Sequence, residues 1–260
     1  IPAWYGPDKK IFVASNYKEA KKLAKKKYKK DLELVRDEDV LDTWFSSGLW
    51  AFATLGWPNK SEYLKKFYPT SVLVTGFDII FFWVARMMMF GMEFLNKQPF
   101  KEIYVHALVR DEKGQKMSKS KGNVIDPLEL IEKYSADALR FTLLSMASPG
   151  RDVKLSEDRV KGYRNFLNKV WNANNFLRQN ECDFSDIRKP ENLKLTINKW
   201  ILSELVKTKN ETENSLKNYR FDEAAKNIYQ FVWHSFCDWY LELSKTCLLY
   251  TSDAADETER

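Results

Sequence analysis

The chain has 260 residues, 44% hydrophobic and 30% charged, and a formal net charge of +6, a composition that supports one large or two ordinary folded domains. Three cysteines without a C-x-x-C spacing exclude a disulfide framework and a four-thiolate zinc site. The most apolar stretch, residues 71–95, contains three charged side chains, which excludes a membrane-spanning helix. We therefore expect a protein of a reducing compartment, located in the cytoplasm and without contact with a membrane.

Basic residues concentrate at the start of the chain. The first thirty residues hold ten lysines against only Asp8 and Glu19, so this segment carries a net charge of +8. The run from Lys21 to Lys30 is typical of the solvated face of a helix or of a connector, and contact with nucleic-acid phosphate is the alternative. The chain opens on Ile1 rather than Met and shows no secretory signal, so we expect a fragment.

Glycine and proline separate the chain into two parts. All nine glycines lie at or before Gly162 and all eight prolines at or before Pro190, which predicts a turn-rich part with strands followed by a helical part. Residues 71–75 predict a buried strand. The helix expected from residue 78 to residue 94 is apolar on nearly every face, which indicates burial, with Met87–Met89 filling the core.

A second strand is predicted at residues 103–109, followed by a polar turn at 111–115. The tetrapeptide Asp-Pro-Leu-Glu at 126–129 has the form of a helix start, with Asp as N-cap and Pro in the first position. This alternation is typical of an open α/β sheet, in which ligands bind beyond the carboxyl ends of the strands. From Ser156 onward three apolar stripes recur with a period of 3.6, which predicts three helices packed as a bundle.

The most specific pattern is the loop from Lys116 to Ser120, Lys-Met-Ser-Lys-Ser. Two lysines three residues apart, with hydroxyls between them, form a movable cationic clamp that suits phosphate. Such a clamp aids a reaction only if it binds more tightly as charge builds on departing phosphate oxygens. A solvated basic turn is the alternative interpretation. It is the weaker one, because a strand precedes the loop and a capped helix follows it.

Three further positions are candidates for chemistry. Gly76-x-Asp78 stands at a strand-to-helix turn, where a carboxylate can accept hydrogen bonds from ribose hydroxyls or can simply cap the helix. Trp44 could wall a small apolar pocket, although a tryptophan in isolation more often belongs to a core. His106, on the second strand, is more often a buried and hydrogen-bonded histidine, and no Cys/His cluster accompanies it, so we expect no metal site.

The sequence resembles a known family. The pentapeptide at 116–120 matches the lysine signature of the class I aminoacyl-tRNA synthetases, and the flanking sequences resemble the valyl branch of that family in particular. The resemblance covers residue 1 to about residue 245 and rests on five ungapped stretches: 39–47, 68–87, 108–127, 136–142 and 236–243. The isoleucyl and leucyl relatives share the scaffold but differ around Trp44 and Asp78.

The resemblance implies a two-part fold, α/β followed by all-α. Residues 1–40 would return from an editing insertion, and residues 41–150 would form the second half of a Rossmann-type catalytic domain with the lysine loop. Residues 151–245 would form the first part of a helical anticodon-binding domain. Residues 246–260 do not continue the resemblance, and we expect a non-native tail there. The His-Ile-Gly-His tetrapeptide of the first half-site and the editing domain do not occur in the chain.

The activity that the resemblance implies is ATP-dependent activation of valine and its transfer to tRNA(Val), with ATP and its Mg²⁺ as cofactors and no obligate protein partner. Lys116 and Lys119 would be the catalytic lysines. The resemblance assigns ATP binding to these residues: Lys116, Ser118, Lys119, Ser120, Gly76, Asp78 and His106. It assigns the walls of the valine pocket to three more: Trp44, Ile79 and Trp83.

Two alternatives stay open. An apolar pocket discriminates weakly between small side chains, so a synthetase for isoleucine or another aliphatic amino acid would have the same fold. The second alternative is of a different class: a non-catalytic module that binds tRNA or a nucleotide. The first half-site is missing, which favours this alternative for the isolated chain. We therefore expect these 260 residues by themselves to show no valine activation.

Overall fold

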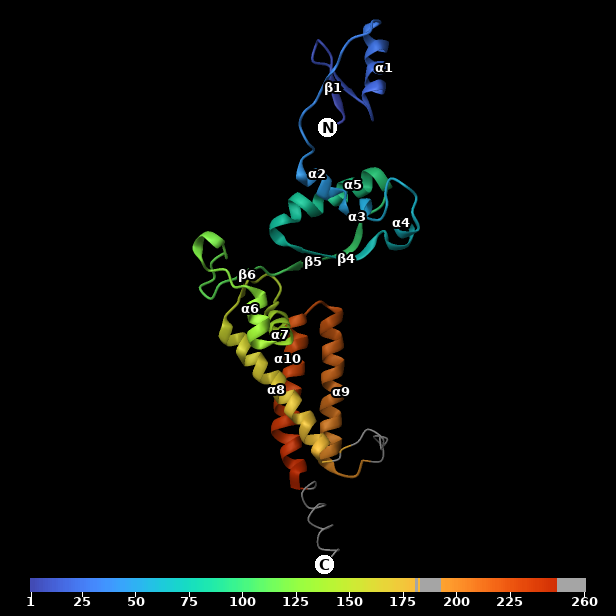
Figure 1. The fold of residues 1–260 in the computed structure, drawn as a ribbon. Helices are drawn as coiled ribbons and strands as arrows, with labels where there is room; N and C mark the ends of the chain where they lie inside the picture. Colours follow the sequence, from blue (N-terminus) through green and yellow to red (C-terminus); the bar gives the residue numbers. More distant parts are fainter. Residues whose placement is uncertain (181, 183–192, 247–260) are drawn as a thin grey trace, which may run out of the picture. The chain divides into compact units, whose positions relative to one another are not determined.

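The computed structural model describes residues 1–180, 182 and 193–246 (Figure 1). The chain divides into two compact units, unit 1 (Ile1–Ile103) and unit 2 (Tyr104–Arg260). The boundary falls inside the strand β5 (Phe100–His106). Among the described residues, no helix combines the length and the apolar character needed to cross a membrane.

The first part of unit 1 is a small antiparallel sheet with one helix packed on it. Its elements are β1 (Ala3–Tyr5), β2 (Ile11–Val13), α1 (Tyr17–Tyr28) and β3 (Val35–Arg36), with the strands in the order β2-β1-β3. Ala20 and Ala24 of α1 are buried in one cluster with Trp4 and Phe12, because alanine lets the helix approach the sheet closely. Most of the lysine run thus lies on an exposed helix face (Lys22, Lys25, Lys26 and Lys27), whereas Lys29 and Lys30 follow the helix.

The second part of unit 1 packs helices on a pair of strands. Its elements are α2 (Thr43–Gly48), α3 (Trp50–Ala53), α4 (Glu62–Phe67), β4 (Thr70–Gly76), α5 (Ala85–Leu95) and β5. A strand at 71–75 is confirmed as β4, which pairs with β5. Its predicted burial is only partly correct: Leu73 and Thr75 are buried and Val74 is 59% exposed, because successive side chains of a strand point to opposite faces. The strand predicted at 103–109 starts earlier and ends at His106, because Leu108 already accepts a hydrogen bond from Val153 in another sheet (2.8 Å).

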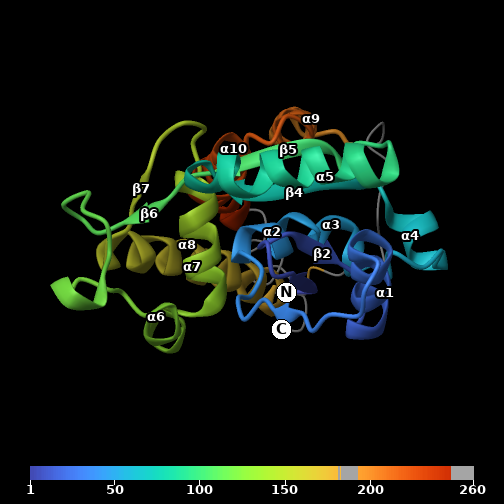
Figure 2. The ribbon, with the colours of Figure 1, turned by 90° about the horizontal axis from the view of Figure 1, so that it is seen from above.

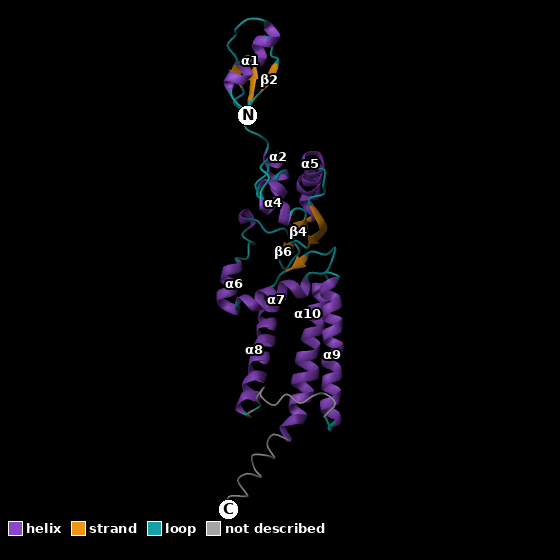
Figure 3. Ribbon diagram, turned by 90° about the vertical axis from the view of Figure 1, so that its right-hand side faces the viewer, coloured by secondary structure: helices purple, strands orange, loops and turns teal. Residues whose placement is uncertain are grey.

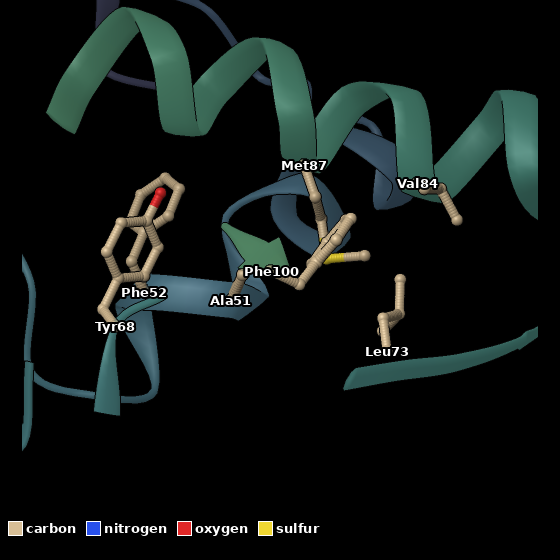
Figure 4. Close-up of a cluster of buried hydrophobic side chains, with 7 residues drawn as sticks. All are labelled: Ala51, Phe52, Tyr68, Leu73, Val84, Met87 and Phe100. Carbon is tan, nitrogen blue, oxygen red and sulfur yellow. The ribbon is translucent and has the colours of Figure 1, made fainter. Parts of the chain in front are cut away.

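The helix expected from residue 78 to residue 94 is not continuous, and its predicted burial is wrong. A 3-10 turn, η1 (Phe77–Ile79), and a π-turn, η2 (Ile80–Val84), precede α5. Phe81 is 80% exposed and Met89 66% exposed, because the helix packs along one side only. Figure 4 shows Met87 pointing from α5 into the buried cluster, which consists of Ala51, Phe52, Tyr68, Leu73, Val84, Met87 and Phe100.

Unit 2 combines a two-stranded parallel sheet with helices. Its elements are β6 (Val109–Arg110), η3 (Lys119–Lys121), α6 (Pro127–Tyr134), α7 (Ala136–Met146), β7 (Val153–Lys154), α8 (Glu157–Gln179), α9 (Thr196–Lys217), α10 (Phe221–Gln230) and the π-helix η5 (Phe231–Leu241). The predicted helix start is confirmed: Asp126 accepts a hydrogen bond from the Leu128 N–H (2.8 Å), and Pro127 opens α6.

The predicted three-helix bundle is confirmed in unit 2. Helices α8 and α9 lie beside a third helix that α10 and η5 form together (Figure 3). Helix α7 packs against the start of α8 (Figure 2), where Val160 is fully buried. The predicted stripe on α8 is only partly correct. Trp171 is 66% exposed, because the buried positions further along this helix are Phe166 and Ala173.

Replacing Met87 tests the one-sided packing of α5. We expect Met87→Ala to lower the free energy of unfolding by about 2–5 kcal/mol, since it leaves a cavity in the core. Met89→Ala is the matched control on the exposed side of the same helix and should change stability by less than about 0.5 kcal/mol. Denaturant titration followed by circular dichroism measures both values, and equal effects would contradict the described packing.

Acid should destabilise unit 2. The guanidinium of Arg220 holds the pKa of Asp222 below its ordinary 3.8, and Lys133 with Tyr134 holds the pKa of Glu157 below 4.5. A carboxyl whose pKa is lowered by folding stabilises the fold above its unfolded pKa, and this contribution is lost as the pH falls through the folded value.

The melting temperature should therefore stay level from about pH 7 to pH 5 and fall below about pH 4. Asp222→Asn removes one of these titrating groups, so the acid-induced fall should be smaller in that variant. A wild-type melting temperature that is constant to about pH 3 would show that these carboxyl groups do not stabilise the fold.

Candidate functional site

Three residues predicted for the amino-acid pocket come together in unit 1. Trp44, Ile79 and Trp83 line one pocket of about 290 Å³, and Ser47 and Trp50 complete its lining. Trp50 was not among the residues predicted for this pocket. Its position six residues after Trp44, on the next short helix, was the available signal.

Asp42 fixes the position of Trp44. Its carboxylate accepts hydrogen bonds from the backbone N–H groups of Trp44 (3.0 Å) and Phe45 (3.3 Å), which makes it the N-cap of α2. The same oxygen accepts from Arg86 on α5 at 3.1 Å. One carboxylate therefore starts the helix that carries Trp44 and links it to the helix that follows Trp83.

Trp83 is also fixed in its place in the lining. Its indole N–H donates to the Ser47 carbonyl at 3.0 Å, so the polar atom of the ring is satisfied. The rings of Trp50 and Trp83 lie 5.7 Å apart. A β-carbon on Gly48 would lie 2.6 Å from the ring of Phe90, so glycine is needed for α2 to come this close to α5. The lining of the pocket is consequently almost entirely apolar.

Asp78 lies next to Ile79 in the chain and is exposed at the turn after β4. The alternative that it caps the helix is wrong, because the turn begins after Gly76, and Asp78 is its second residue rather than the residue before it. Gly76 is the buried last residue of β4. Asp78 is therefore exposed and does not cap the helix.

The lysine loop belongs to unit 2 and lies between β6 and α6. Lys116 and Ser120 are exposed, and the hydroxyls of Ser118 and Ser120 lie 3.2 Å apart. The backbone of Lys119 opens the short turn η3, whereas its side chain lies outside the described part of the chain. The place of the Lys119 ammonium group therefore stays a prediction.

His106 is not the buried histidine that was expected. It is exposed at the last position of β5, and its Nδ1 lies 3.0 Å from the carbonyl oxygen of Ala107. Within residues 1–180, 182 and 193–246, no group of three or more His, Cys, Asp or Glu side chains could hold a metal ion.

The site residues are divided between the two units. The pocket, Gly76 and Asp78 belong to unit 1, and His106 and the lysine loop belong to unit 2. That they form one site is a prediction from the resemblance. The donor set of the loop, two ammonium groups and two hydroxyls, fits the phosphates of ATP by its charge.

Substitutions at Asp42 separate its two roles. We expect Asp42→Ala to destabilise unit 1 by about 1 kcal/mol, because α2 loses its N-cap. Asp42→Asn keeps a capping oxygen and loses only the largely exposed ion pair with Arg86, so it should cost less than about 0.5 kcal/mol. Denaturant titration of both variants measures the difference. Equal losses would assign the stabilisation to the ion pair instead.

Two family models match the chain. The model of the tRNA synthetases class I (I, L, M and V) matches residues 6–156, and the model of the anticodon-binding domain of tRNA ligase matches residues 198–258. The two matches lie in the order that the resemblance predicts. The second match extends into residues 247–260, which lie outside the described residues, so the expected non-native tail stays a prediction.

Curated relatives are similar over most of the chain. The chain is 76% identical to a valine–tRNA ligase of Pelagibacter ubique (strain HTCC1062) over 260 residues, which are all of this chain and 30% of that protein. It is 60% identical to a valine–tRNA ligase of Bartonella quintana (strain Toulouse) over 245 residues, which are 94% of this chain and 27% of that protein. The chain thus spans less than a third of the length of these relatives.

Solved structures share the fold. Agrobacterium radiobacter K84 agnB2 LeuRS, in a ternary complex with tRNA and LeuAMS, aligns with a TM-score of 0.70 at 17% identity, covering 89% of this chain and 34% of that chain. The methionyl-tRNA synthetase of Mycobacterium tuberculosis bound by methionyl-adenylate aligns with a TM-score of 0.66 at 17% identity, covering 90% of this chain and 49% of that chain. At these identities the likeness concerns the fold alone.

Proposed function

The chain belongs to the class I tRNA synthetases (I, L, M and V), and we propose that it is part of a valine–tRNA ligase, which activates valine with ATP and transfers it to tRNA(Val). The observation that carries this proposal is the apolar pocket of Trp44, Ile79 and Trp83 in a chain that is 76% identical to a valine–tRNA ligase. We also propose a cytoplasmic location and no obligate protein partner.

In the proposed site the pocket takes the side chain of valine. Trp44, Ile79 and Trp83 would surround a small branched aliphatic group, whose transfer from water into an apolar lining is favourable. Asp78, exposed beside Ile79, would accept hydrogen bonds from the polar groups of the nucleoside and the amino acid. Gly76 would allow the nucleoside to approach the backbone, and His106 would contribute to ATP binding from the end of β5.

The lysine loop supplies the charge that the reaction needs. A carboxylate oxygen of valine forms a bond to the α-phosphorus of ATP while the bond to pyrophosphate breaks, and negative charge grows on the departing oxygens. The ammonium groups of Lys116 and Lys119 would stabilise this charge, and Ser118 and Ser120 would donate hydrogen bonds to the phosphates. Mg²⁺ would accompany the phosphates of ATP.

The helices of unit 2 give the proposed place of tRNA binding. The family match over residues 198–258 includes most of α9 and all of α10 and η5. We propose that tRNA(Val) is bound by this part of the enzyme. The pocket residues alone do not distinguish valine from isoleucine or another aliphatic amino acid. Specificity for one of these therefore remains the alternative proposal.

Replacing Lys119 tests the proposed chemistry. In a full-length ligase that contains this chain, Lys119→Ala should slow ATP–pyrophosphate exchange with valine by roughly 100- to 1,000-fold, the scale of one lost donor to developing charge. Lys65→Ala, at an exposed position of α4, is the matched control and should leave exchange unchanged. Unchanged exchange in Lys119→Ala would remove this residue from the mechanism. Faster exchange of the wild-type ligase with isoleucine than with valine would favour the alternative specificity.

A further inference from the structure

We infer that Asn123 is a positioning residue of the lysine loop, which with Asp111 forms a latch that orders the loop for ATP. The Asn123–Asp111 latch is the contact between these two side chains, twelve residues apart in the chain. Its role in ATP binding rests on the proposed function. The ordering of the loop does not, because it is a property of the described contacts alone.

The side-chain amide of Asn123 makes three hydrogen bonds. Its oxygen accepts from the Ser118 N–H at 2.9 Å. Its nitrogen donates to the Asp111 carboxylate at 2.8 Å and to the Lys116 carbonyl at 3.3 Å. The first and the third residue of the lysine signature, Lys116 and Ser118, are thus both bound by Asn123, which follows the turn, so the amide closes the loop into a ring.

Asp111 anchors this ring to the polar turn at 111–115. Its second carboxylate oxygen accepts from the Gln115 N–H at 2.6 Å, and its carbonyl accepts from the Gly114 N–H at 2.9 Å. The hydrogen bond from Asn123 holds the pKa of Asp111 below its ordinary 3.8, so the carboxylate is ionised and can only accept. This charge orients the amide of Asn123 with its nitrogen toward Asp111 and its oxygen toward Ser118.

The polar turn at 111–115 is itself attached to a sheet. Arg110, the residue before Asp111, belongs to β6 and forms an ion pair with Asp152. The strands β6 and β7 pair in parallel, with Arg110 opposite Lys154. The latch therefore connects the lysine loop to the strand β6 and so to the sheet of unit 2.

The bound segment carries the turn on which Lys119 lies. The Lys121 N–H donates to the Ser118 carbonyl at 3.2 Å and closes η3. Gly122 has φ +63°, with no atom within 4 Å of where a β-carbon would stand, so this position favours glycine for its backbone conformation. A loop that is ordered before ATP binds loses less conformational entropy on binding. The latch should therefore lower the KM for ATP.

Trypsin tests the latch in this chain without any assumption about function. Asn123→Ala should raise the cleavage rate after Lys116, Lys119 and Lys121 by about tenfold or more, because cleavage requires local opening of the loop. The melting temperature should change little, since both side chains are near the surface. Asn172→Ala, at an exposed position of α8, is the matched control and should leave the cleavage rate unchanged.

Exchanging the two side chains tests the specific contact. Asn123→Asp alone places two carboxylates face to face and should open the loop as much as Asn123→Ala does. The double variant Asp111→Asn/Asn123→Asp restores a donor at one position and an acceptor at the other, and it keeps an acceptor for the Ser118 N–H. It should therefore return toward the wild-type cleavage rate. Wild-type rates in the single variants, or no rescue in the double variant, would overturn the latch.

Kinetics of a full-length ligase that contains this chain test the positioning role. Asn123→Ala should raise the KM for ATP by about tenfold, with a smaller loss in kcat, and the double variant should reverse the change. Faster trypsin cleavage with an unchanged KM and kcat would mean that the latch only supports the fold, which overturns the positioning role. If the wild-type ligase itself shows no exchange with valine, the proposed function fails while the trypsin result stands.

Discussion

The close approach of α2 to α5 determines the geometry of the apolar pocket in unit 1. Gly48 leaves room for the ring of Phe90, and the Asp42 carboxylate joins the first turn of α2 to Arg86. Because these contacts fix the distance between the two helical segments, Trp44 and Trp83 face a common space. The hydrogen bond from Trp83 to the Ser47 carbonyl then leaves an apolar surface toward that space. The pocket is a product of helix packing rather than of a flexible loop.

The lysine loop is organised in a different way. Of its residues, Met117 and Ser118 are only partly buried, and hydrogen bonds rather than apolar packing hold its shape. Packing positions a pocket rigidly, because an interior resists small displacements. A few exposed hydrogen bonds can open at modest cost in free energy. The apolar pocket is therefore held by packing, whereas the lysine loop is held by the hydrogen bonds of the Asn123–Asp111 latch.

Local patterns in the sequence predicted much of this fold. The capped helix start at Asp126, the strand at 71–75 and the three helices of the bundle each have a pattern of capping residues or apolar spacing that can be read within a short stretch of sequence, and all three elements are confirmed. The predicted fold class is likewise confirmed by the matches to the class I catalytic domain and the anticodon-binding domain. The domain boundaries and the site assignments stay predictions.

What the sequence could not predict depends on contacts between distant residues. Composition shows that residues 78–94 are apolar but not which side of the helix finds a partner, so the burial of Met89 was predicted wrongly. The hydrogen bond between Asn123 and Asp111 also has no local signature, since twelve residues separate its partners. His106 is the last residue of β5, and no pattern in the sequence distinguishes an exposed position there from a buried one.

The composition of the pocket has an optical consequence. Three of the nine indoles in the chain, those of Trp44, Trp50 and Trp83, line this one cavity of about 290 Å³. Indole emission shifts in wavelength with the polarity of its surroundings. Filling the cavity with an aliphatic group would displace water from several of these rings at once. Occupancy of the pocket thus carries its own intrinsic fluorescence signal, which needs no attached dye.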